Sequence, residues 1–150
     1  MDDTVLPDVL AWEGIVSRLG PHDDHPWHPL PWHGTFSKVL MFDRATGQTL
    51  ELGKIAAGAV FPEHSHPTLQ AQYLISGRLR LPSGAVIEPG AFNLIPAGQP
   101  HGPFEALEEA VSLKYFASVP EYVLSDGSRF RYNRGDGQPP LHRTSASARG

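Results

Sequence analysis

Three histidines and one glutamine have the spacing of a metal-binding site. His64 and His66 are two residues apart, and alternate residues of a strand share a face, so both imidazoles would lie on one side, about 7 Å apart. Gln70 begins the next segment, and His101 follows a tight turn at Pro96-Ala97-Gly98. A His-x-His pair alone is more often an ordinary half-buried pair. The second histidine-bearing turn favours a divalent metal ion held by all three imidazoles.

The composition excludes several other kinds of site. The 150 residues include no cysteine, which rules out disulfides, cysteine-based metal clusters and a thiol nucleophile. The net charge is −4, so the basic surface of a nucleic-acid-binding protein is missing. The N-terminus lacks the pattern of a signal peptide, and no stretch approaches the roughly 18 apolar residues of a spanning helix. We therefore expect a cytoplasmic protein with neither nucleic acid nor membrane as a partner.

The middle of the chain has the pattern of an all-β domain. Glycine and proline number 15 each, and they divide the sequence into short apolar-polar alternating segments. The expected strands are Phe36–Phe42, Thr49–Ala56, Val60–His66, Gln70–Ile75, Arg78–Leu81, Ala85–Ile87, Phe92–Ile95, Gly102–Phe104 and Ala110–Phe116. A slip of the alternation near Gly53 predicts a β-bulge there. About nine such strands predict a sandwich or barrel.

Two segments flank this middle region of the chain. We expect an N-terminal arm at 1–34, a barrel at 35–124, and a C-terminal hairpin with a flexible tail at 125–150. Val9–Leu19 fits either a short helical turn or an extended arm, and Tyr122–Leu124 with Phe130–Tyr132 fits a hairpin through Asp126-Gly127. The proline-rich segment Gly20–Gly34 is expected to lie extended on the sheet through two tryptophans, Trp27 and Trp32. The alternative for it is a second metal site formed by His22, His25, His28 and His33.

The two histidine segments resemble the two sequence motifs of the cupin superfamily, also called RmlC-like. The first motif, G-x5-H-x-H-x3,4-E-x6-G, is matched by Gly58, His64, His66, Gln70 and Gly77, with glutamine in place of glutamate. The second, G-x5-P-x-G-x2-H-x3-N, is matched by Gly90, Pro96, Gly98 and His101, with Glu105 in place of asparagine. The resemblance implies a double-stranded β-helix, or jelly-roll barrel, with the metal in its interior.

The flanking residues narrow the resemblance. Trp32-His33-Gly34, the strand LELGKIAAGAV and the run PEHSH are similar to one cupin branch. That branch contains acetylacetone-cleaving and 2,4'-dihydroxyacetophenone dioxygenases and the cupin half of an anti-sigma factor. It implies three histidine ligands to iron, a small-molecule substrate, O2 as co-substrate, and a homodimer.

Replacement of the motif glutamate by Gln70 indicates the chemistry. A divalent ion held by three neutral imidazoles keeps its full charge and is the stronger Lewis acid toward an anionic ligand. Fe(II) is therefore favoured, with room for a diketone enolate or hydroxyketone and for O2, while Zn and Ni remain alternatives because imidazole does not select among these metals. Gln70 would coordinate the ion or orient a bound water.

These observations predict a dioxygenase that cleaves a C–C bond of a small diketone or hydroxyketone. The alternative is a non-catalytic, metal-bound cupin that acts as a ligand-binding or sensor module. Glu105, four residues after His101, would face the interior if its strand continued in register, and could then orient His101 or accept a proton from substrate. Phe92, Phe104 and Phe116 would line an apolar pocket, and Tyr73 would pack in the core.

Overall fold

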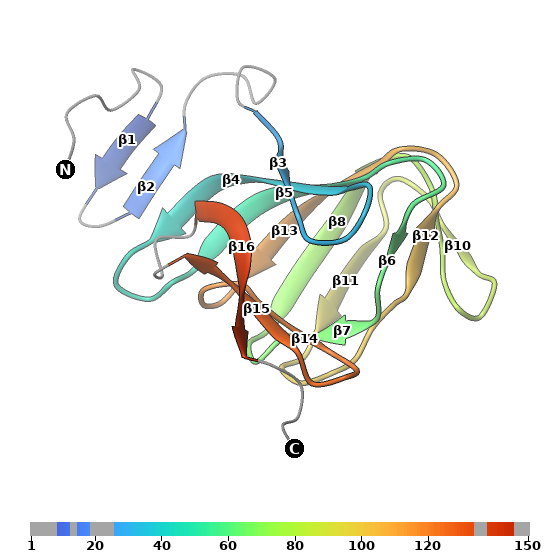
Figure 1. Ribbon diagram of the computed structural model, residues 1–150. Coiled ribbons are helices and arrows are strands. Elements are labelled where there is room, and N and C mark those ends of the chain that lie inside the picture. Colours follow the sequence, from blue (N-terminus) through green and yellow to red (C-terminus); the bar gives the residue numbers. More distant parts are fainter. Residues whose placement is uncertain (1–8, 13–14, 19–25, 134–137, 146–150) are drawn as a thin grey trace.

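The computed structural model describes residues 9–12, 15–18, 26–133 and 138–145 (Figure 1). These residues form strands joined by turns and loops, and no helix occurs among them. A helix that is long and apolar enough to cross a membrane is accordingly absent from this part of the chain. The all-β prediction is confirmed for the described residues.

The largest sheet has eight antiparallel strands. Its order is β1 (Val9–Trp12), β2 (Ile15–Arg18), β4 (Thr35–Asp43), β5 (Thr49–Ile55), β13 (Ala110–Phe116), β8 (Gln70–Ser76) and β11 (Phe92–Ile95), and β3 (His28–Pro29) also pairs with β4. The consecutive β4–β5 hairpin is followed by β13, more than fifty positions further on, because the chain crosses to other sheets in between. Crossings of this kind are typical of a jelly roll.

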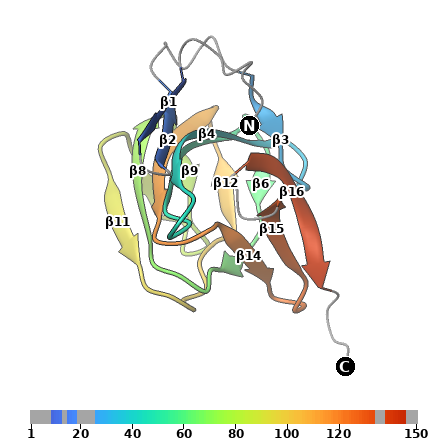
Figure 2. The same cartoon turned by 90° about the vertical axis from the view of Figure 1, so that its left-hand side faces the viewer.

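Two smaller sheets complete the barrel (Figure 2). One has the order β10 (Val86–Ile87), β9 (Leu79–Arg80), β12 (Phe104–Ala106) and β6 (Val60–Phe61), and the other β16 (Gln138–Ser145), β15 (Arg129–Asn133), β14 (Glu121–Leu124) and β7 (His64–Ser65). The core between the sheets is formed by Leu30, Val39, Phe42, Ile55, Ala59, Phe61, Leu74, Leu79, Phe104, Ala106, Ala110, Phe116 and Tyr122. The predicted jelly-roll barrel of a single domain is confirmed.

Gly53 does not form the β-bulge that its sequence context predicted. It pairs in register with Ser37 on one side and Ser112 on the other, and the register shifts lie between Val39 and Met41 and between Val111 and Ser112. A Cβ on Gly53 would lie 2.9 Å from Cε of Lys114. Glycine is thus needed at this position for space inside the barrel and not for an irregular backbone.

Several expectations about the ends of the chain are changed by the structure. Val9–Trp12 and Ile15–Arg18 are strands, so the helical turn is wrong, since their pairing with each other and with β4 supplies backbone partners that an isolated helical turn lacks. The hairpin β14–β15 is confirmed. Part of the expected tail, Gln138–Ser145, pairs with β15 as strand β16.

The two tryptophans of the proline-rich segment have different surroundings. The ammonium groups of Lys38 and Lys54 lie 4.5 and 4.6 Å from the ring centre of Trp27, which places Trp27 on the sheet as expected. Trp32 instead packs into the barrel end, with its ring 5.2 Å from Phe61 and 5.5 Å from Tyr122. It is partly buried against the core.

Tyr73 and Phe92 lie outside the core, contrary to expectation. Tyr73 is 45% exposed and Phe92 64% exposed, and they are direct partners across β8 and β11. Alternation turns Gln70 and Leu74 inward on β8, so the tyrosine between them must point outward. Of the three phenylalanines expected along the pocket, Phe104 and Phe116 are buried.

Candidate metal centre

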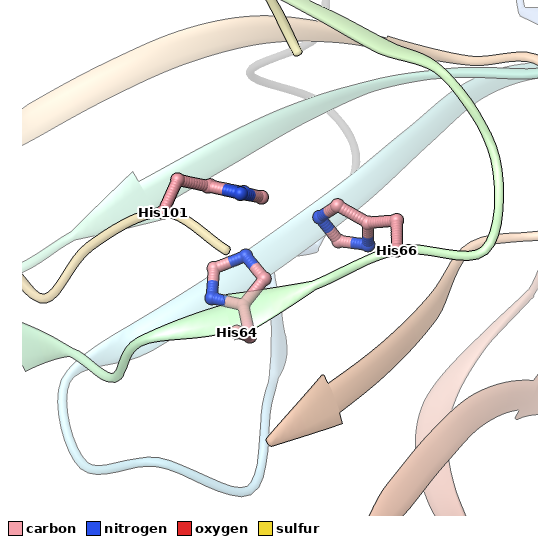
Figure 3. A group of neighbouring side chains, drawn as sticks. All are labelled: His64, His66 and His101. Atoms are coloured by element: carbon pink, nitrogen blue, oxygen red, sulfur yellow. The ribbon is translucent and has the colours of Figure 1, made fainter. Parts of the chain in front are cut away.

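Three histidines from two separate segments of the chain meet in the barrel interior (Figure 3). His64 lies in β7 and His101 faces it, and the backbones of the two exchange hydrogen bonds of 3.0 and 2.9 Å. His66 follows two positions after His64, so its ring joins the same face. The candidate ligand atoms of the three lie within 4.8 Å of one another.

Each histidine is oriented by a backbone carbonyl. Nδ1 of His64 donates to the oxygen of Pro62 at 2.7 Å, and Nδ1 of His101 donates to that of Gln99 at 3.0 Å. A carbonyl can only accept, so these contacts place the proton on Nδ1 and leave the Nε2 lone pair for a metal. The buried Nε2 atoms of His66 and His101 have no hydrogen-bond partner. The donor set therefore fits a divalent ion.

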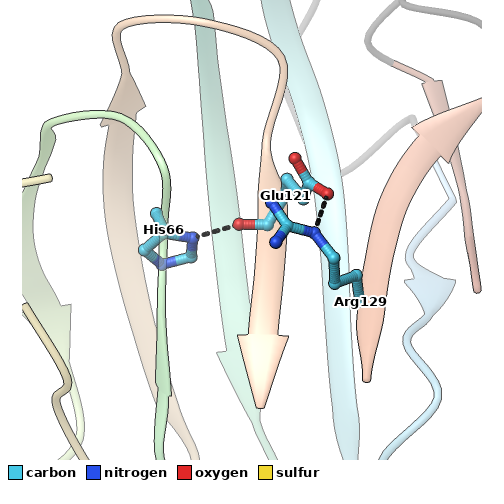
Figure 4. Close-up of polar contacts among 3 residues, drawn as sticks. All are labelled: His66, Glu121 and Arg129. Carbon is cyan, nitrogen blue, oxygen red and sulfur yellow. Dashed lines mark hydrogen bonds and ion pairs between the residues drawn. The ribbon is translucent and has the colours of Figure 1, made fainter. Parts of the chain in front are cut away.

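The carbonyl that orients His66 belongs to Glu121, on a strand far along the chain (Figure 4). Nδ1 of His66 donates to the backbone oxygen of Glu121 at 2.7 Å, and the Glu121 carboxylate accepts a 2.8 Å bond from Nε of Arg129. The hairpin β14–β15 carries both Glu121 and Arg129. This hairpin consequently sets the orientation of a candidate ligand histidine more than fifty residues away.

Burial keeps all three imidazoles neutral. Desolvation is the largest cause, and it lowers the pKa of His66 to about 3, of His64 well below its ordinary value, and of His101 in the same direction. The positive charge of Lys114 lowers all three further. Neutral imidazoles are the metal-binding form, so the site is ready to bind without first losing protons.

The metal-free protein is expected to lose stability as the pH falls below 6.5. In the unfolded chain His66 takes up a proton near its ordinary pKa of 6.5, whereas in the folded chain it does so near 3, so the unfolded state binds more protons in that interval. Between pH 6.5 and 5 the cost is about 2 kcal/mol from His66 alone. Urea unfolding of the metal-free protein at several pH values measures it, and His66→Gln should flatten the slope. A slope equal to that of the unsubstituted protein would contradict the shift.

Gln70 lies beside the histidines. Its amide is neutral, unlike the carboxylate that the first cupin motif has at this position. Gln70 is the first residue of β8, is 1% exposed, and its buried Oε1 has no hydrogen-bond partner. It lines the same cavity as His64 and His101. This cavity has a volume of about 20 Å³, which is room for roughly one water molecule.

The structure places Glu105 on the outside of the barrel, so the expectation that it faces the interior is wrong. Phe104 and Ala106 take the inward positions of β12, and the Glu105 carboxylate accepts a 3.2 Å bond from Nε of Arg80. Strand pairing of Glu105 with Arg80 sets this register. The Glu105 side chain is 45% exposed, far from the role of a buried base.

The alternative of a second metal site in the proline-rich segment is not assembled among the described residues. His22 and His25 lie outside the part of the chain that the structure describes. His28 is in β3 and His33 is exposed in the following turn. The described residues contain one group of three candidate metal ligands, His64, His66 and His101.

Sequence reasoning missed three buried polar side chains: Tyr122 and Lys114 lie beside the histidines, and Glu51 is the strand partner of Lys114. Glu51 and Tyr122 are 0% exposed and Lys114 is 9% exposed. The Tyr122 ring lies 5.1 Å from that of His64 and 4.8 Å from that of His66. One signal was available, because Lys114 alternates with Ser112 and Phe116 along a strand whose other inward positions are small or apolar.

Residues 18–117 match the sequence model of the ChrR cupin-like domain. The chain belongs to this cupin family. A search of proteins with curated functions finds no match. The predicted membership of the cupin superfamily is confirmed, and the histidine cluster occupies the interior of a cupin barrel.

Three solved structures illustrate the likeness of fold. A candidate acetylacetone dioxygenase from Methylibium petroleiphilum is 20% identical with a TM-score of 0.63, covering 77% of this chain and 88% of that one. An acetylacetone dioxygenase from Acinetobacter johnsonii is 16% identical with a TM-score of 0.56, covering 80% of each chain. A chain of the Rhodobacter sphaeroides complex of SigE with the anti-sigma ChrR is 18% identical with a TM-score of 0.54, covering 64% of this cupin and 51% of that chain.

Proposed function

We propose that this cupin binds Fe(II) through His64, His66 and His101 and, with O2, cleaves a C–C bond of a small diketone or hydroxyketone. The observation that carries the proposal is the donor set itself. Three neutral imidazoles converge with their Nδ1 atoms tied to carbonyls, and Gln70 stands where the cupin motif has a carboxylate. Such a set leaves the ion its full charge toward an anionic substrate.

The protein's own residues would bind the ion, orient the histidine rings and keep water away from the site. Bound Fe(II) would supply a Lewis acid and a source of electrons for O2. The carbonyl of Glu121 holds the His66 ring, and Phe116 and Tyr122 pack against that ring at 5.0 and 4.8 Å, which excludes water from one side. The Gln70 amide lies beside His66 and would position a ligand by hydrogen bonding.

The second candidate function is a metal-bound sensor or ligand-binding module without turnover. The match to the ChrR cupin-like domain favours it. So does the cavity of about 20 Å³, because a diketone is several times larger than the one water that fits there. Catalysis therefore requires cavity-lining side chains, such as half-buried Gln72, to move when substrate enters.

Oxygen uptake separates the two functions. The protein is loaded anaerobically with Fe(II) and supplied with acetylacetone, other diketones and hydroxyacetophenones, and we expect consumption of O2 equal to the substrate lost. Protein loaded with Zn(II) is the control and should consume none. Gln70→Glu should keep the metal and lower turnover at least about tenfold, because the new carboxylate offsets part of the ion's charge. Full iron loading with no uptake on any substrate would support the sensor instead.

We also propose a cytoplasmic homodimer. The absence of cysteine suits a reducing compartment. The edge strand β11 and its neighbour β8 expose apolar side chains that a second copy would cover, namely Tyr73, Ile75, Phe92 and Leu94.

A further inference from the structure

The cavity wall beside the histidines carries a buried lysine. Lys114 on β13 lines the same cavity as His64 and His101 and is 9% exposed. Taking an ammonium group out of water costs several kcal/mol unless other groups compensate it. The surroundings of Lys114 supply that compensation.

Three residues form a pocket for the ammonium group. Glu51 is the direct partner of Lys114 across β5 and β13 and is 0% exposed, and the Phe61 ring centre is 4.9 Å from Nζ. At Gly53 a Cβ would lie 3.1 Å from Nζ, so the missing side chain leaves the space that the lysine occupies. Desolvation lowers the pKa of Lys114 and the charge of Glu51 raises it.

The position of these two buried, oppositely charged residues points to a role beyond stability. A buried ion pair contributes little net stability compared with apolar side chains of the same volume. The positive charge of Lys114 reaches the histidines, since it acts on all three of them. A cation beside a divalent ion is unfavourable unless an anion joins them.

We propose that Lys114 is a specificity-determining residue that binds the negatively charged oxygen of a ligand held at His64, His66 and His101, so that the cavity selects carboxylate or enolate anions over neutral analogues of the same shape. Glu51 is the positioning residue that holds Lys114 and balances its charge while the site is empty of ligand. This inference rests on the metal site of the proposed function. It does not require turnover.

Formate and formamide test the inference, because they are the smallest pair of similar shape that differs in charge. Binding of each to the Zn(II)-loaded protein is followed by NMR titration, after zinc content is shown to be one per chain. The double variant Glu51→Gln/Lys114→Met removes both charges together, so neither Glu51 nor Lys114 is left as a buried ion without the other. It should keep zinc, bind formate at least about tenfold more weakly, and bind formamide as before.

Lys54→Met is the matched control. Lys54 lies on β5 three residues from Glu51, with its ammonium on the outer face near Trp27 and Phe36, and its loss should leave formate binding unchanged. An unchanged formate affinity in the double variant, with zinc retained, would overturn the role of Lys114. An equal loss in Lys54→Met would also overturn it, because it would show a general effect of charge.

A measurement on the unsubstituted protein covers the case in which the double variant does not fold. The 13Cε resonance of Lys114 should shift when formate binds and stay in place when formamide is added. An unmoved resonance at saturating formate contradicts the proposal. Absence of oxygen uptake together with a lysine-dependent preference for formate would count against the dioxygenase alone. Failure of the protein to bind either Zn(II) or Fe(II) would contradict both proposals.

Discussion

Replacing His64 or His101 with alanine is expected to lower the metal content of the dialysed protein from one divalent ion per chain to none. Each imidazole would supply one of the three bonds to the ion, and its Nδ1 is already hydrogen-bonded to a carbonyl. Removing a group that only supports a ligand already weakens metal binding about 10- to 100-fold. Removing a ligand itself should therefore weaken metal binding by more than about 100-fold. Elemental analysis of dialysed protein, with competition against a chelator, measures the change.

His33→Ala is the matched control for these two variants. His33 is exposed in the turn before β4 and belongs to no group of candidate ligands among the described residues. Its replacement should leave the metal content at one per chain. Circular dichroism must show the same strand content for all three variants. Metal retained by both His64→Ala and His101→Ala would refute the centre.

Gly77→Ala is expected to destabilise the fold by at least about 3 kcal/mol. Gly77 has a φ of +82°, which costs an L-residue roughly 1–2 kcal/mol. A Cβ there would also meet the backbone of the next sheet neighbour, with Ala110 Cα at 2.6 Å and the Glu109 carbonyl oxygen closer still. The clash pushes β13, which carries Lys114, away from β8.

A thermal melt and urea unfolding would measure this loss, with a fall in Tm of roughly 10 °C expected for a chain of this size. Gly84→Ala separates the two causes. Gly84 also has a positive φ, +90°, but a Cβ there meets nothing within 4 Å. It should therefore cost only the backbone share, roughly 1–2 kcal/mol. Equal losses in the two variants would show that the contact with β13 is not the cause.

The strands and the pairing of His64 with His66 were predictable because both depend on local spacing. Turn residues divide the chain into alternating segments, and a two-residue interval puts His64 and His66 on one face whatever the remainder of the fold does. The hairpin β14–β15 was predictable for the same reason, since Asp126-Gly127 specifies a turn. That His101 would lie beside His64 was predictable only through the resemblance to the cupin motifs.

Glu105 shows where local reasoning failed. Four residues after His101, the sequence allows either face, and the register is decided by pairing with Arg80 on a strand 25 positions earlier. The same holds for Tyr73 and Phe92, whose exposure depends on what covers the outer face of β8 and β11. The alternation along a strand shows which residues share a face, but only the packing against a neighbouring sheet decides which face is buried.

By itself the sequence determined that this chain is an all-β cupin with three histidines able to share an ion, because strand alternation, turn residues and motif spacing are local properties of the chain. The tertiary structure alone decided which polar groups share the interior with those histidines. It pairs Glu51 with Lys114, 63 positions further on, across two strands. It also decides that a Cβ at Gly77 would clash with the backbone at Glu109 and Ala110, whereas a Cβ at Gly84 would meet nothing within 4 Å. Contacts between distant segments follow from sheet order and register. Both depend on pairing between segments that lie far apart in the sequence, so no single segment determines them.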